Sequence, residues 1–232
     1  MVEAGDGRAV VVKPRAQVEE VLAELLKVRC PGALNIYDES ACIANGDRPG
    51  QANARLTALS AYLMGHWSAP IAFIGEAPGK NGARHSGVPF TSMRTLTGSG
   101  VAEPSATIVQ NTLAALRVDH QVLLWNASML FPPGNRDPTA SELQACRRVL
   151  GLVTHGRTVY AIGRHAQAAT GAPYLRHPAN GGGPAFTAGV RAIFQSSPGA
   201  DIAALLRSLE SGPAPQKPVP AVRTRAGTSR RQ

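Results

Sequence analysis

A short apolar run that ends abruptly at glycine and proline constrains the fold of this chain most. Ile71–Ile74 is rich in β-branched and aromatic residues, as a buried parallel strand is, and Gly75-Glu76-Ala77-Pro78-Gly79 follows directly. Such breakers let the backbone turn tightly and approach a ligand closely. Glu76 therefore stands at the carboxyl end of a predicted strand, where open α/β sheets bind their ligands.

The rest of the chain alternates between strand and helix patterns. Apolar runs at Val122–Trp125, Thr158–Ile162 and Val190–Phe194 predict three more strands. The alternation predicts an α/β fold with three layers (α/β/α) around a central, mainly parallel four-stranded sheet. Helices are predicted at Gln17–Val28, Ala52–Met64, Ser105 (as the cap) to Leu116, Thr139 (capping box) to Val153, Arg164–Ala169 and Ile202–Leu209.

Composition and punctuation divide the chain into one domain with two tails. Residues 1–13 are predicted to be a flexible N-terminus, 14–211 a single domain, and 212–232 a disordered basic tail. Within the domain, the segment 29–50 predicts an irregular loop, and the Gly-rich segment 177–184 predicts another. No apolar run approaches the ~20 residues of a membrane helix, and no signal peptide is evident. We expect a cytoplasmic, monomeric protein.

The charge of the chain favours a polyanionic partner. The formal net charge is +9, and five basic residues of the tail meet no acid there. A basic protein with a basic arm suits nucleic acid, and a nucleoid-associated location would follow. Basic tails can also be solubilising only, so the charge leaves both readings open. The five residues are Lys217, Arg223, Arg225, Arg230 and Arg231.

Polar side chains stand where predicted strands end or in loops beside them. Glu76 follows the first strand, Asn126 follows the second, and His177 begins a Gly-rich loop. Because the carboxyl ends of parallel strands share one edge of a sheet, Glu76 and Asn126 are expected to lie close together, within reach of the His177 loop. Taken singly, each residue could be structural, as an Asn that caps a turn is.

Four segments, in order, resemble motifs of the uracil-DNA glycosylase superfamily, most closely its bacterial and archaeal iron–sulfur (family 4-like) branch. They run from Ile71 to Phe194, over half the chain. The segments are Gly75-Glu76-Ala77-Pro78-Gly79 with Gly87-Val88-Pro89-Phe90, the stretch from Asn126 to Pro138 with its Pro-Pro-Gly-Asn-Arg, Ala161-Ile162-Gly163-Arg164-His165-Ala166, and His177-Pro178-Ala179. The resemblance implies a DNA repair enzyme that hydrolyses the N-glycosidic bond of uracil or a related damaged base in DNA and leaves an abasic site.

The resemblance also implies roles for residues around the extruded base. His177 would donate to the uracil O2, and Asn126 would read the O4/N3 edge and reject cytosine. Phe90 would stack on the base, and Glu76 would position the attacking water and offset the positive charge of the sugar. Gly75 and Ala77 would border the base. Ala77 stands where sister branches have Asp or Asn, so the handling of water rests on Glu76.

DNA contacts follow from the same resemblance, because the base must leave the duplex to enter such a pocket. His85 lies where the branch usually has acidic residues, so it is a candidate for altered specificity. The residues expected to contact DNA are Gly79, Arg84, His85, Asn135, Arg136, Asn180, Gly181 and Gly182.

The cysteines depart from the pattern of the iron–sulfur branch, which uses four of them. This chain has three, Cys30, Cys42 and Cys146, and only Cys146 falls where the branch has a ligand. We therefore expect no cluster, no other metal and no cofactor.

Two other functions remain open from the sequence. The altered segment Asn81–His85 is compatible with a lesion- or base-binding protein on the same fold that no longer turns over. A nucleotide-binding α/β domain would use Gly75–Gly79 as a phosphate loop, but the sequence has neither a P-loop Lys-Ser/Thr nor G-x-G-x-x-G to support it.

Overall fold

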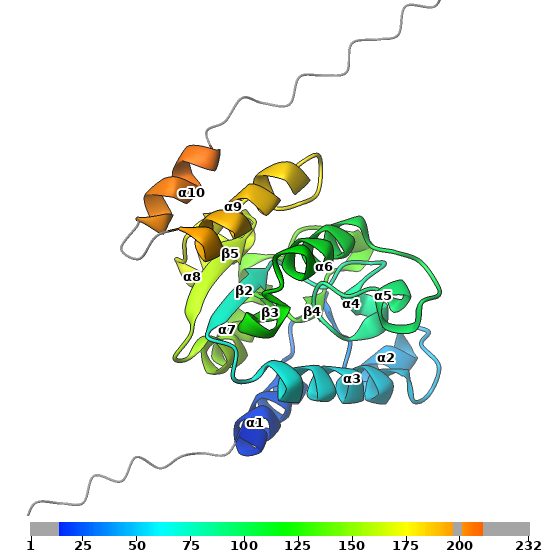
Figure 1. Ribbon diagram of the computed structural model, residues 1–232. Coiled ribbons are helices and arrows are strands. Elements are labelled where there is room, and N and C mark those ends of the chain that lie inside the picture. Colours follow the sequence, from blue (N-terminus) through cyan, green and yellow to red (C-terminus); the bar gives the residue numbers. More distant parts are fainter. Residues whose placement is uncertain (1–13, 197–200, 211–232) are drawn as a thin grey trace, which may run out of the picture.

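A four-stranded sheet lies at the centre of the structure (Figure 1). The computed structural model describes residues 14–196 and 201–210, so the predicted tails 1–13 and 212–232 lie outside the described residues. All neighbouring strands of this sheet run parallel. In spatial order they are β3 (Val122–Asn126), β2 (Ile71–Gly75), β5 (Thr158–Ile162) and β6 (Tyr174–Leu175).

Helices cover both faces of the sheet, which confirms the predicted three-layer α/β/α class. One face packs on α1 (Pro14–Lys27), α3 (Gln51–His66), α7 (Ala140–Thr154) and α8 (Arg164–Thr170). The other face packs on α6 (Pro104–Leu116), α9 (Gly183–Gln195) and α10 (Ile202–Glu210). None of the described helices is long and apolar enough to cross a membrane.

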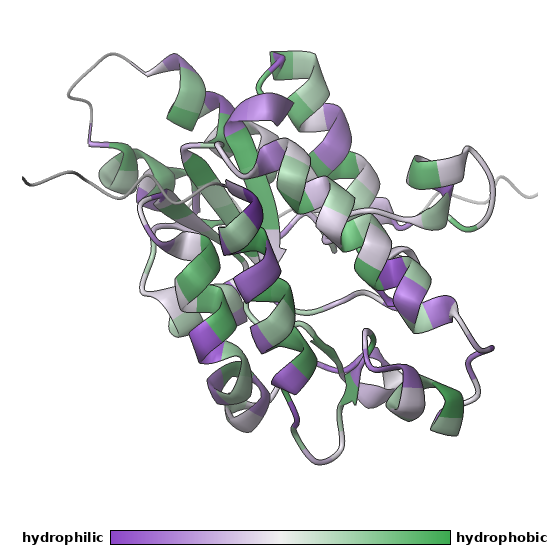
Figure 2. Cartoon of the chain, turned by 90° about the horizontal axis from the view of Figure 1, so that it is seen from below, coloured by the Kyte–Doolittle hydropathy of each residue, from purple (hydrophilic) through white to green (hydrophobic). Residues whose placement is uncertain are grey.

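The alternation of side chains along β2 feeds two separate cores. Ala72 and Ile74 join the core under α1 and α3, whereas Phe73 joins the core under α6 and α9. Figure 2 shows the strands coloured hydrophobic and the helices carrying both hydrophobic and hydrophilic residues. A strand buried on both faces is apolar almost throughout, which explains why β2, β3 and β5 could be recognised in the sequence as apolar runs.

The start of α7 shows how local sequence fixes an element. The Thr139 hydroxyl accepts from the Glu142 backbone N at 3.3 Å, and the Glu142 carboxylate accepts from the Thr139 backbone N at 2.9 Å. This reciprocal pair confirms the predicted capping box.

The predicted strand Val190–Phe194 is wrong, because these residues form the second half of α9. Phe186 and Val190, four residues apart, are both buried, and Gly189 lies against the Leu175 side chain of β6. The apolar run is therefore part of the buried face of a helix, and this face already includes Phe186, which precedes the five residues predicted as a strand. The fourth strand is β6, whose two residues are too few to give a pattern.

Two further expectations need correction. The segment 29–50 is not wholly irregular, since it contains β1 (Leu34–Asn35), which pairs antiparallel with β4 (Leu130–Phe131), and α2 (Glu39–Ala44). Ser105 does not cap α6, which begins at Pro104, so that Glu103 is the N-cap residue. The remaining short elements are α4 (Ala83–Ser86), α5 (Met93–Thr97) and the 3-10 turns η1 (Asp119–Gln121) and η2 (Pro133–Asn135).

Candidate active site

A pocket of about 330 Å³ opens at the carboxyl ends of β2 and β3. Of the residues expected from the sequence to surround a base, Glu76, Ala77, Phe90, Asn126 and His177 line it, whereas Gly75 is not among the lining residues. Ligands of open α/β sheets bind at this edge. The pocket is also lined by Pro78, Gly79, Ala83, Glu103, Ser105, Pro132, Asn135, Arg136, Asp137, Pro138, Ala179 and Asn180.

The Glu76 carboxylate is held by the start of α8. Its Oε1 accepts a hydrogen bond from the His165 backbone N at 3.0 Å. Gly163 makes room for it, because a Cβ at that position would overlap Oε1, and its φ of 97° also favours glycine. The strand–turn that begins at Ala161 therefore fixes the direction of the candidate water-handling group.

Gly75 lets the Phe90 ring and the Asn126 amide approach its backbone closely. A Cβ on Gly75 would overlap the Phe90 ring and lie 2.6 Å from Asn126 Oδ1. Gly75 and Asn126 are also partners in the β2–β3 register, which places the amide at the strand end. Phe90 has a left-handed φ of 51°, and Gln110 Nε2 donates to its carbonyl at 3.1 Å. The ring is thus positioned by a strained backbone with a dedicated partner.

His177 presents one defined nitrogen to the pocket. Its Nδ1 accepts a hydrogen bond from the Ala179 backbone N at 3.2 Å, so the proton of the neutral ring is assigned to Nε2. Burial lowers the pKa of His177, and the charge of Glu76 opposes that effect only in part. The site therefore contains a neutral imidazole with a free N–H donor beside a carboxylate.

Two predicted DNA-contacting arginines have internal partners. Arg84 is only 12% exposed and binds Asp47, with Nη2 2.7 Å from Oδ1. Arg136 Nη1 lies 3.0 Å from the buried Glu142 carboxylate, although its guanidinium remains partly exposed at the pocket rim. Each guanidinium is therefore paired with a carboxylate of the protein, and the predicted contacts of both with DNA stay predictions.

The other predicted DNA-contacting residues are divided between the pocket and its surroundings. Gly79, Asn135 and Asn180 line the pocket, and Asn135 Oδ1 accepts from the Lys80 backbone N at 2.7 Å. His85, Gly181 and Gly182 are not among the lining residues. His85 is exposed to solvent over part of its surface, and the partial burial of the rest, followed by the charge of Arg84, lowers its pKa.

Several residues of the site carried no signal that marked them in the sequence. Glu103 is the N-cap residue of α6, and Gln110 lies in the middle of that helix, outside the motifs. Only the fold brings Glu103 to the pocket and Gln110 to the backbone of Phe90. The role of the His165 backbone could not be seen, because a backbone N–H has no sequence signature. Gly163 belongs to the third motif, but the sequence does not show that it packs against Glu76.

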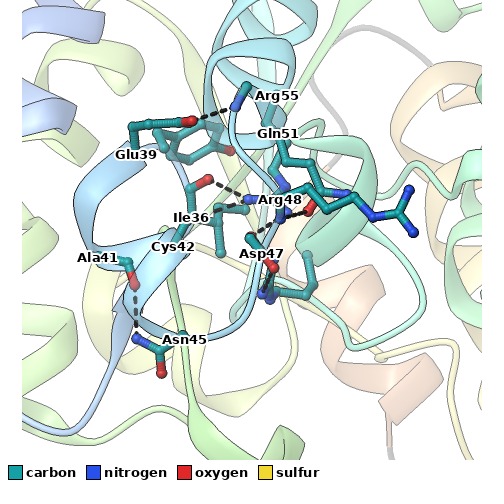
Figure 3. A network of polar contacts seen from close by, with 12 residues as sticks. Ile36, Glu39, Ala41, Cys42, Asn45, Asp47, Arg48, Gln51 and Arg55 are labelled. Carbon is teal, nitrogen blue, oxygen red and sulfur yellow. Dashed lines mark hydrogen bonds and ion pairs between the residues drawn. The ribbon is translucent and has the colours of Figure 1, made fainter.

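An ion-pair network holds the segment 29–50 (Figure 3). Asp47 binds Arg55 of α3, with 2.6 Å between Oδ2 and Nη2, and it also binds Arg84 of α4. Arg55 Nη1 donates to the Ile36 carbonyl at 2.9 Å. The hydrogen bonds that Asp47 accepts, first from Arg84 and then from Arg55, outweigh its burial and lower its pKa to about 2. A separate bond from the Tyr37 hydroxyl to the Gly87 carbonyl, at 2.7 Å, ties the segment to the loop before Phe90.

The cysteines of this region do not fit a four-cysteine iron–sulfur cluster. The chain has three cysteines, one fewer than the four thiolates of such a cluster. Cys42 donates to the Asn35 carbonyl at 3.5 Å, while Cys146 accepts from the Met129 backbone N at 3.4 Å. In residues 14–196 and 201–210, no group of three or more His, Cys, Asp or Glu side chains is placed to hold a metal ion.

The fold and the pocket define an α/β protein with a polar site at the carboxyl edge of a parallel sheet. Residues 64–204 match the sequence profile of the Uracil DNA glycosylase superfamily. This match covers more than half of the chain, and the chain belongs to that superfamily.

Two curated relatives refine the comparison. A type-4 uracil-DNA glycosylase of Sulfurisphaera tokodaii is 32% identical over 105 residues, which cover 44% of this chain and 43% of the relative. A type-4 uracil-DNA glycosylase of Saccharolobus solfataricus is 34% identical over 107 residues, which cover 44% of each chain. The matched segment thus spans less than half the length of these relatives.

A solved structure shares the fold. The crystal structure of Pedobacter heparinus SMUG2 superposes with a TM-score of 0.53 at 14% identity, covering 78% of this chain and 99% of that chain. At this identity the likeness concerns the architecture alone.

Proposed function

We propose that this chain is a monofunctional DNA glycosylase that hydrolyses the N-glycosidic bond of uracil, or of a related damaged base, in DNA. The observation that carries the proposal is the convergence of Glu76, Phe90, Asn126 and His177 on one pocket. These groups supply what the reaction requires, which is stabilisation of an anionic base and of a cationic sugar a few ångströms apart.

His177 stabilises the leaving base. As the bond between C1′ and the base nitrogen breaks, its electron pair leaves with the base and charge develops on O2. The Nε2–H of a neutral imidazole donates to that oxygen, and Nδ1 is already satisfied by Ala179. Removing a preorganised donor of this kind raises a barrier by ~2.7–4 kcal/mol.

Glu76 serves the sugar side of the reaction. Its carboxylate offsets the positive charge at C1′, and it accepts a proton from the water whose oxygen adds to C1′. The hydrogen bond from His165 occupies Oε1 and leaves Oε2 for the water. Ala77 has no polar group to hold this water, so the proposal assigns the water to Glu76.

Asn126 and Phe90 select and hold the base. The amide of Asn126 offers both a donor and an acceptor, which matches the N3–H and O4 of uracil and mismatches cytosine. The Phe90 ring supplies a stacking surface, worth about 1–3 kcal/mol per base in such sites. The absence of a side chain at Gly75 leaves room for both groups beside the end of β2.

The partner and setting belong to the same proposal. The substrate is DNA, single or double stranded, and the enzyme acts as a monomer in the cytoplasm, on the nucleoid. The single domain spans 14–211. The chemistry uses no cofactor, so a purified sample is expected to lack broad absorbance near ~400 nm, whereas such a band would indicate a cluster.

Base excision tests the proposal directly. Single- and double-stranded oligonucleotides that carry uracil, hypoxanthine, xanthine or hydroxymethyluracil are incubated with the protein, and abasic sites are cleaved with alkali. Scission is expected at uracil, with losses of about 10²–10³-fold for His177→Ala and a comparable loss for Glu76→Ala. Glu19→Ala, which removes an exposed carboxylate of α1, is the control.

Two results would contradict these assignments. Activity that survives both Glu76→Ala and His177→Ala would show that the roles are wrong. Tight binding to a damaged oligonucleotide with no scission of any substrate would favour the lesion-binding alternative.

A further inference from the structure

Glu103 places a carboxyl group in the pocket in addition to those of Glu76 and Asp137. It comes from the N-cap position of α6 and lines the same cavity as Glu76 and His177. Its two oxygens lie against the backbone of Gly79 and Gly82, so closely that a Cβ at either glycine would overlap them. The carboxyl group therefore fills a place that two missing side chains leave open in the loop after β2.

This carboxyl group has no internal partner. Within the described residues it makes no hydrogen bond or ion pair, and it does not cap α6 although it occupies the N-cap position. Burial raises the pKa of Glu103. Charged or protonated, a half-buried carboxyl group must find its hydrogen bonds in the contents of the pocket.

The proposed function fixes which part of a base meets this group. His177 takes O2, Asn126 takes N3 and O4, and Phe90 takes a face of the ring. The one edge of uracil left over is C5–C6. The lining residues that these contacts leave unassigned come from the loop from Ala77 to Ala83, from Glu103 and Ser105, from the segment 132–138, and from Ala179 and Asn180. Among them two carry a carboxyl group, and that of Asp137 already lies 3.5 Å from His165 Nε2, so Glu103 is the candidate for this edge.

We propose that Glu103 is a specificity-determining residue, whose carboxyl group faces the C5 edge of the extruded base and discriminates uracil from thymine. The inference rests on the proposed function. With uracil, the space beside C5–H allows a water molecule that satisfies the carboxyl oxygens. The C5 methyl of thymine takes that space and leaves a buried polar group without a partner, which sites discriminate against strongly.

The backbone around Glu103 tolerates a change of its side chain. The Glu103 carbonyl accepts from the Thr107 backbone N at 2.9 Å and from the Thr107 hydroxyl at 3.0 Å, and neither bond involves the carboxyl group. Pro104 independently favours the extended conformation of the residue before it. Substitution therefore leaves the start of α6 in place.

The test compares U·G with T·G mispairs in one duplex sequence, because both are wobble pairs and differ in the C5 substituent. Single-turnover excision rates are measured for wild type, Glu103→Ala, Glu103→Met, Glu103→Gln and the surface control Glu19→Ala. We expect Glu103→Ala and Glu103→Met to raise the thymine-to-uracil rate ratio by about tenfold or more. Glu103→Gln, which keeps polarity and shape, and Glu19→Ala are expected to keep the wild-type ratio.

The other possible outcomes contradict either the role of Glu103 or the proposed function. An unchanged ratio, or undetectable thymine excision, in both Glu103→Ala and Glu103→Met overturns the role of Glu103, as does wild-type excision of thymine at the uracil rate. If wild type unfolds cooperatively but excises neither base here and no base from the single- and double-stranded oligonucleotides above, the proposed function itself fails. Excision of another base without excision of uracil overturns only the role of Glu103.

Discussion

At the scale of single residues, the absence of a side chain at Gly75 determines how closely Phe90 and Asn126 approach the end of β2. We predict that Gly75→Ala lowers kcat/KM for uracil by about 100-fold, the usual cost of displacing a reacting arrangement by ~1 Å. The reason is that the added methyl group would overlap the Phe90 ring and crowd the Asn126 amide. Excision kinetics measure the effect.

Another glycine supplies the matched control for Gly75→Ala. Gly65 lies within α3 with open space around its Cα. Gly65→Ala is expected to raise the free energy of unfolding by ~1 kcal/mol and to leave excision unchanged. Wild-type kinetics in Gly75→Ala would show that the close approach is not needed.

The protonation of His177 predicts a pH dependence at the same scale. Because burial lowers its pKa, the imidazole stays neutral until the pH falls below the ordinary value of about 6.5. Protonation of Nδ1 then breaks the bond from Ala179, and kcat/KM declines on the acidic side. The pH profile of kcat/KM is the measurement, and an acid limb centred at or above about 6.5 would contradict the assignment.

At the scale of elements, the Asp47 network stabilises the segment between α1 and α3. Arg55 is 4% exposed, so removing its carboxylate partner leaves a buried charge uncompensated. We predict that Asp47→Asn lowers the free energy of unfolding by about 3 kcal/mol. Denaturant titration measures it, and Arg15→Ala, which breaks an exposed pair of α1, is expected to cost less than about 1 kcal/mol.

The Asp47 carboxylate also makes the contribution of the network to stability depend on pH. The pKa of Asp47 is lowered to about 2, so its stabilising contribution is present above its ordinary value of 3.8 and is lost as the pH falls toward 2. Asp47→Asn is expected to flatten the fall of stability over this range. An unaltered slope would mean that other carboxylates cause it.

The elements also show what the sequence could and could not predict. β2, β3 and β5 were predictable because parallel strands buried on both faces are apolar runs, and Glu76, Asn126 and His177 because they stand beside strand ends. Val190–Phe194 was misread, since a short apolar run does not distinguish a strand from a buried helix segment. Glu103 reaches the pocket only through the packing of α6, which no local pattern encodes.

At the scale of the whole molecule, charge is concentrated in the C-terminal segment. We predict that replacing its five basic residues by Gln in the full chain makes the dependence of log Kd on log salt shallower by about 3–4, since each phosphate contact contributes ~0.9. Binding to an undamaged duplex at several salt concentrations measures this. The single-turnover rate at saturating enzyme is expected to stay at the wild-type value, and an unchanged slope would exclude the segment from DNA binding. The residues are Lys217, Arg223, Arg225, Arg230 and Arg231.

The order of the strands in the sheet bears on when the site can form during synthesis and folding. β2 is the first strand of the sheet to be synthesised, yet it ends up between β3 and β5, so it has no neighbours until later parts of the chain are made. The backbone N–H that holds Glu76 follows it by 89 residues, and His177 comes later still. Contacts so distant along the chain form slowly. During refolding, we therefore expect the proposed excision activity to return only with the completed sheet, well after the local helices have formed.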